Sequence, residues 1–87
     1  MTKESPRTEE YLEYIYKLQE MHESATTSKL ADRLELAPSS VSEMLRQLEQ
    51  KGLVEYAEKG VVLTEDGELA AKKVIRKHRL SERLLTD

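Results

Sequence analysis

The 87-residue sequence contains no cysteine, tryptophan or phenylalanine, and only two prolines and three glycines. Without cysteine, the chain forms neither a disulfide framework nor a thiolate metal site. No apolar run approaches the roughly 18 residues of a membrane-spanning helix, and the start, MTKESPRTEEY, lacks the apolar core of a secretory signal. These absences favour one small cytoplasmic domain, residues 1–87, with no membrane partner.

Charge is distributed unevenly along the chain. Residues 1–50 hold 6 basic and 10 acidic side chains, whereas residues 51–87 hold 8 basic and 7 acidic ones. Six of the basic residues lie within 72–83, a cluster typical of a solvated helix face. The net charge of −3 is unusual for a strong nonspecific nucleic-acid binder, because such binding depends on neutralising phosphates. Binding to DNA therefore requires a local concentration of basic side chains or a dimer.

Hydrophobic periodicity predicts three helices in the first fifty residues. Thr8, followed by two glutamates, predicts the start of the first helix, with a hydroxyl cap and carboxylates in the first turn. A short second helix is predicted to open at Thr27. Pro38 suits an early position of the third helix, and Gly52 suits its end. The predicted inward positions are Tyr11, Ile15, Leu18, Leu30, Ala31, Leu34, Val41, Leu45 and Leu48.

After Gly52 the hydrophobic period changes to that of strands. The runs LVEY and VVL are rich in β-formers and are separated by AEKG, whose Gly60 suits a tight hairpin turn. Thr64 then predicts the cap of a long helix that begins TEDGELAAKK. The order of helix, helix–turn–helix, two-stranded hairpin and long helix predicts an α+β fold, mainly α, of the winged helix–turn–helix type.

Polar side chains occupy the outward face of the predicted third helix. In a helix–turn–helix the second helix enters the major groove, and its first residues contact base edges. Glu43 suits cytosine N4, and Arg46 suits guanine or a phosphate. The alternative is a solvated helix face on which Ser39 is only a cap. The candidate DNA-binding residues are Thr27, Pro38, Ser39, Ser40, Ser42, Glu43, Arg46, Gln47 and, in the hairpin turn, Lys59.

The last helix contains an irregularity in the stretch AAKKVIRKHRLSERLL. Ala71, Val74 and Ile75 begin an apolar stripe that helical spacing continues at positions 78 and 82. Those positions hold His78 and Glu82, so an imidazole and a carboxylate are expected on the face that the helix buries. For His78 alone, a partly buried histidine that is hydrogen-bonded to a neighbour is the alternative to a ligand.

Three segments together carry a family resemblance: EEYLEYIYKL, APSSVSEMLRQLEQKGLV and VVLTEDGELAAKKVIRKHRLSERLL. In this order they resemble the N-terminal domain of the diphtheria-toxin-repressor and manganese-transport-regulator family of metal-dependent transcriptional repressors. The most specific parts are LT-x-x-G opening the last helix and RKHRLSERLL closing it. The resemblance implies a repressor, not an enzyme, with no small-molecule substrate. Such repressors bind double-stranded operator DNA as homodimers when loaded with Mn²⁺ or Fe²⁺.

The resemblance also implies the metal ligands. They are His78 and Glu82 in the last helix and Glu10 and Glu13 in the first. Each pair has a helical spacing that presents two donors on one face, and mixed oxygen and nitrogen ligation suits Mn²⁺ or Fe²⁺. Iron-type members place methionine at the position of Glu10 and use a cysteine, so this sequence favours manganese. The family continues into a dimerisation segment with further ligands, and because this chain ends at Asp87, we expect a partial metal site.

Two other functions remain open from the sequence. A winged helix can serve protein contacts alone, and a helix–turn–helix regulator can bind DNA without a metal. A metal-dependent enzyme is the third class considered, and it would need a substrate cleft and an open coordination position beside a general base. The sequence offers no nucleophile constellation, and we therefore expect no enzymatic activity.

Overall fold

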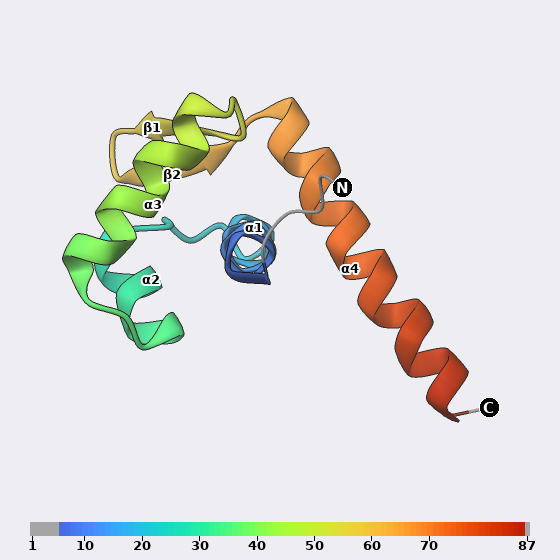
Figure 1. Cartoon of the computed structure of the whole chain (residues 1–87). Helices are drawn as coiled ribbons and strands as arrows, with labels where there is room; N and C mark the ends of the chain where they lie inside the picture. Colours follow the sequence, from blue (N-terminus) through green and yellow to red (C-terminus); the bar gives the residue numbers. More distant parts are fainter. Residues whose placement is uncertain (1–5, 87) are drawn as a thin grey trace.

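The element order confirms the predicted winged helix–turn–helix (Figure 1). The computed structural model describes the backbone of residues 6–86 and the side chains of residues 7–78. Helices α2 and α3 form the helix–turn–helix, strands β1 and β2 form the wing, and α4 is the long last helix. The elements are α1 (Pro6–Glu20), α2 (Thr27–Leu34), α3 (Pro38–Gln50), β1 (Val54–Ala57), β2 (Gly60–Leu63) and α4 (Glu65–Thr86).

Helix α1 lies between the helix–turn–helix and α4, and Figure 1 shows it nearly end-on. Because it packs on both sides, Leu12 is fully buried although it lies outside the predicted apolar stripe. The predicted inward positions of the first three helices are buried too, except Leu34, which is partly buried. Burial raises the pKa of Tyr11 above its ordinary value, and the nearby Arg7 guanidinium opposes this shift.

One predicted helix cap is wrong, whereas the predicted early position of Pro38 in α3 is confirmed. Helix α1 begins at Pro6, and Thr8 lies inside its first turn with 3% exposure, so the predicted Thr8 cap is wrong. Proline is favoured at the first helical position because its φ is already helical. The same reason explains α3, which begins at Pro38 and has no side-chain cap, so Ser39 is not a cap. Helix α2 begins at Thr27, as predicted.

The wing is an antiparallel hairpin in which Val54 pairs with Leu63 and Ala57 with Gly60. The backbone N–H of Val61 also donates to the Ala25 carbonyl at 3.0 Å. Strand β2 therefore pairs with β1 on one side and with Ala25, through an isolated bridge, on the other. Gly60 has φ +113°, and a Cβ there would run into the Ala25 carbonyl oxygen. The predicted turn glycine is confirmed, and close backbone approach adds a second requirement for it.

The LT-x-x-G motif joins the wing to α4. The Thr64 hydroxyl donates to the Gly52 carbonyl at 2.6 Å and accepts from the Gly67 N–H at 3.0 Å, which confirms the predicted cap. The Thr64 N–H donates to the Leu53 carbonyl at 3.0 Å. A Cβ on Gly67 would run into that same Leu53 oxygen. The motif therefore combines a helix cap with a close approach of α4 to the end of the turn before β1.

Helix α4 extends past α1, and its C-terminal half leaves the rest of the domain (Figure 1). Ala71 and Val74 are buried and Ile75 is partly buried, but the His78 side chain is 52% exposed. The expectation that His78 lies on a buried face is therefore wrong, because the packing between α4 and α1 ends near this residue. Within residues 6–86, no helix is both long and apolar enough to cross a membrane.

We expect Gly67→Ala to lower the free energy of unfolding by about 1–3 kcal/mol, because the added Cβ displaces the Leu53 carbonyl. Chemical denaturation measures this loss. The control is Gly52→Asn, where nothing lies within 4 Å of an added Cβ. Asparagine tolerates the left-handed φ of +79° there. A Gly67→Ala variant as stable as the parent would contradict the close approach.

Candidate functional site

The outward face of α3 is polar and exposed over its whole length. Its opposite face carries Val41, Leu45 and Leu48, each at most 2% exposed, which fixes the orientation of the helix on the core. The hydrophobic packing thus leaves the predicted DNA-binding side chains directed to solvent. The exposed α3 residues of the predicted set are Pro38, Ser39, Ser40, Ser42, Glu43, Arg46 and Gln47.

Two predicted DNA-binding residues lie outside α3. Thr27 is the first residue of α2 and is partly buried, next to Thr26, whose hydroxyl accepts from the Lys29 N–H at 3.1 Å. Lys59 is exposed in the turn between β1 and β2. Both α2 and β1 contact α3, so these two residues belong to elements that flank it.

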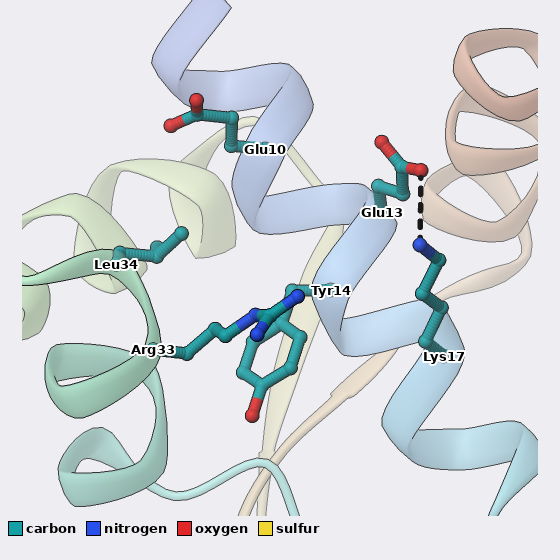
Figure 2. A pocket seen from close by; sticks show the side chains of 6 residues that line it. All are labelled: Glu10, Glu13, Tyr14, Lys17, Arg33 and Leu34. Atoms are coloured by element: carbon teal, nitrogen blue, oxygen red, sulfur yellow. Dashed lines mark ion pairs between the residues drawn. The ribbon is translucent and has the colours of Figure 1, made fainter. Parts of the chain in front are cut away.

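Glu13 and His78 meet between α1 and α4. Their closest atoms, Glu13 Oε1 and His78 Nδ1, are 3.3 Å apart. The Glu13 side chain is 21% exposed, and its other oxygen, Oε2, lies 3.3 Å from Lys17 Nζ (Figure 2). The structure therefore brings together one oxygen donor and one nitrogen donor of the predicted metal ligands, from two different helices.

Glu10 does not join them. The side chains of Glu10 and Glu13 point in different directions (Figure 2), each toward its own basic neighbour. Arg7 Nη1 lies 3.7 Å from Glu10 Oε1, and the Glu10 side chain is 57% exposed. Glu13 instead contacts Lys17 and His78. Neighbouring charges thus separate the two carboxylates. Both still line an open pocket of about 240 Å³ between α1 and the end of α2, together with Tyr14, Lys17, Arg33 and Leu34.

The donor chemistry fits Mn²⁺ or Fe²⁺ as a partial site. Carboxylate oxygen and imidazole nitrogen without thiolate are donors that these ions accept. The side chain of Glu82 lies outside the described residues, although its backbone is part of α4. Among residues 7–78, no three histidine, aspartate or glutamate side chains converge on one point. Glu13 and His78 are thus two adjoining groups of suitable chemistry, and a metal ion there would need further ligands.

A second contact between α1 and α4 was not predicted. Lys77 Nζ lies 3.0 Å from Glu9 Oε2, and the Glu9 side chain is only 18% exposed. Glu9 and Glu13 are four residues apart on α1 and meet consecutive residues of α4. In the sequence, this contact is indicated only by a lysine next to His78 and by the four-residue spacing of Glu9 and Glu13. Which side chains pair becomes clear only from the packing of the two helices.

Helix α1 also contacts the helix–turn–helix through an aromatic side chain. The Arg33 guanidinium of α2 lies over the Tyr14 ring, 5.6 Å from its centroid (Figure 2). At an exposed position a cation–π contact contributes about 0.5–1 kcal/mol. The residue after Glu13 therefore contacts the first helix of the helix–turn–helix.

Comparisons with known proteins identify relatives over nearly the whole chain. The family model for the iron-dependent repressor, N-terminal DNA-binding domain, matches residues 3–62. The diphtheria toxin repressor of Corynebacterium diphtheriae is 42% identical over 81 residues, which cover 92% of this chain and 36% of the relative. The regulator MntR of Shouchella clausii, a helix–turn–helix-type transcriptional regulator, is 38% identical over 90% of this chain and 55% of its own length.

A solved structure extends the likeness to three dimensions. The manganese regulator SloR superposes with a TM-score of 0.78 at 35% identity, over 88% of this chain and 36% of that one. This chain thus spans about a third to about half of the length of these relatives.

We expect Lys77→Gln to lower the free energy of unfolding by about 0.5–1 kcal/mol at low ionic strength, because Glu9 loses its partner. The difference from the parent should shrink in about 1 M NaCl, where the Debye length is only about 3 Å. Thermal unfolding at both salt concentrations measures it. Lys73→Gln, an exposed lysine one turn earlier on α4, is the control. Equal losses in the two variants would show that the Glu9 pair contributes nothing.

Proposed function

Because the chain belongs to the iron-dependent repressor family, we propose that it is the DNA-binding domain of a transcriptional regulator that responds to Mn²⁺ or Fe²⁺. The family consists of repressors, and the prediction that the chain is not an enzyme is confirmed. We retain residues 1–87 as one domain. Its place of action is the cytoplasm, where operator DNA is accessible.

The exposed polar face of α3 supports the DNA-binding role. Ser39 and Ser40 are small, so the start of α3 can approach the duplex closely, and its first backbone N–H groups attract phosphate oxygens. Further along the helix, Glu43 accepts from cytosine N4, while Arg46 donates to guanine or to a phosphate. Lys59, exposed in the turn of the wing, makes a sequence-independent contact with the DNA backbone in this proposal.

The contact between Glu13 and His78 is the observation that carries the metal-dependent role. Glu13 and His78, together with Glu10 and Glu82, would hold a Mn²⁺ or Fe²⁺ ion, whose two positive charges would offset the carboxylates. To act as a ligand, Glu10 would have to leave its contact with Arg7. The carboxylate at position 10 favours manganese over iron. By neutralising carboxylates in the acidic half of the domain, the ion also reduces repulsion of phosphates.

The partners follow from the same proposal. The protein binds double-stranded operator DNA as a homodimer, in which two copies of α3 contact two half-sites. This chain spans only part of its relatives' length, and we assign the dimer contact to none of the residues that the structure describes. One copy alone binds a half-site weakly, because no second copy is held at high effective concentration next to the other half-site.

Arg46→Ala should weaken binding to a selected DNA sequence by about tenfold or more and relax base preference at one position, because a good base contact contributes about 1–3 kcal/mol. Lys59→Ala should weaken binding to all DNA sequences alike and make the DNA affinity depend less steeply on the salt concentration. Selection from a random DNA library followed by fluorescence anisotropy at several KCl concentrations measures both. Lys73→Ala on α4 is the control. If the parent shows no salt-dependent DNA binding with or without Mn²⁺, the domain serves protein contacts instead.

His78→Ala and Glu13→Gln should weaken Mn²⁺ binding by about tenfold or more, because each removes one of two adjoining donors. The increase in DNA affinity on adding Mn²⁺ should fall in proportion. The fold should persist, because neither side chain belongs to the hydrophobic core. His22→Asn is the matched control: it removes the chain's other histidine, which is exposed, and asparagine tolerates its positive φ of 59°. Variants that respond to Mn²⁺ like the parent would refute the metal site.

A further inference from the structure

Both oxygens of Glu13 are contacted by side chains of this domain. Oε1 faces His78 Nδ1 and Oε2 faces Lys17 Nζ, each at 3.3 Å. Lys17 follows Glu13 by four residues on α1, so the two side chains are neighbours on the helix surface. Figure 2 shows the lysine ammonium directed at the carboxylate. The oxygen donor of the proposed metal site therefore already has a cationic partner.

A divalent ion and an ammonium group compete for one carboxylate. An ion held by Glu13 and His78 lies within a few ångströms of Lys17 Nζ, where like charges repel, even with the high effective dielectric of a protein surface. The lysine is covalently attached, so its effective concentration at Glu13 does not fall when the protein is diluted. Ion binding must either displace the ammonium or tolerate it nearby.

We infer that Lys17 is a tethered competitor for the Glu13 carboxylate, which weakens the binding of divalent ions and raises the metal concentration at which the regulator responds. This inference rests on the proposed metal site of Glu13 and His78. It assigns Lys17 a role in setting the affinity, without direct contact with the ion.

Lys17 is expected to lower the affinity for divalent ions without preventing their binding. The Lys17 side chain is 56% exposed, and its flexible stem lets the ammonium leave Glu13 without disturbing the core. Glu20, three residues further along α1, offers the displaced ammonium another carboxylate. Exposed pairs of this spacing are weak, so we expect removal of the lysine charge to tighten ion binding by about two- to fivefold.

The experiment titrates Mn²⁺ alone into the 87-residue chain and follows the loss of the free-ion EPR signal at low ionic strength. Lys17→Gln should lower the apparent Kd for Mn²⁺ by about two- to fivefold, whereas Lys17→Arg, which keeps the charge, should stay close to the parent. Lys29→Gln is the matched control, because Lys29 of α2 forms a similar exposed pair, at 3.2 Å, with Glu23 in the loop between α1 and α2. Circular dichroism checks that each variant is folded.

The outcomes separate this inference from the proposed function. Tightening in Lys17→Gln beyond that in Lys29→Gln supports it. An unchanged Kd, an equal change in the two variants, or weaker binding in Lys17→Gln overturns it, and the metal site stands if Glu13→Gln still reduces affinity. If Glu13→Gln and His78→Ala both bind Mn²⁺ like the parent, the metal site and the competitor role fall together.

Discussion

The close approach of Gly67 to the Leu53 carbonyl determines where α4 begins and in which direction it leaves the wing. Thr64 fixes the same junction by bonding to Gly52 and Leu53 while capping the helix. From Gly67, eleven residues of helix extend about 16 Å to His78. The encounter of His78 with Glu13 therefore depends on a backbone contact about three helical turns away.

The uneven charge of the sequence is explained by the packing of α1 against α4. The acidic first half contributes Glu9 and Glu13, and the basic cluster of the last helix contributes Lys77. From sequence alone this cluster was assigned to a solvated face, yet one of its lysines pairs with α1. The net charge of the chain conceals this complementarity, because it arises between two elements about seventy residues apart.

Local signals predicted most of the fold, and long-range contacts account for what the sequence did not reveal. Helix α2, helix α3 and the hairpin follow from periodicity, Pro38 and turn residues, all of which act within a few positions. The exposure of His78 depends on where α4 leaves α1, which periodicity does not encode. The separation of Glu10 from Glu13 depends on which neighbouring cation each carboxylate meets. Residue types suited to a metal ion could thus be picked out from the sequence, but not how the packing of α1 and α4 arranges them.

The neighbouring positions of Glu13 and Tyr14 have a mechanical consequence. Consecutive residues of an α-helix point about 100° apart, so Glu13 meets His78 of α4 while Tyr14 lies under Arg33 of α2. Helix α1 thus contacts α4 on one side and α2 on another. A rotation of α1 about its axis that changes the distance between Glu13 and His78 moves the Tyr14 ring by the same angle. The contact between Tyr14 and Arg33 therefore links such a rotation to the first helix of the helix–turn–helix.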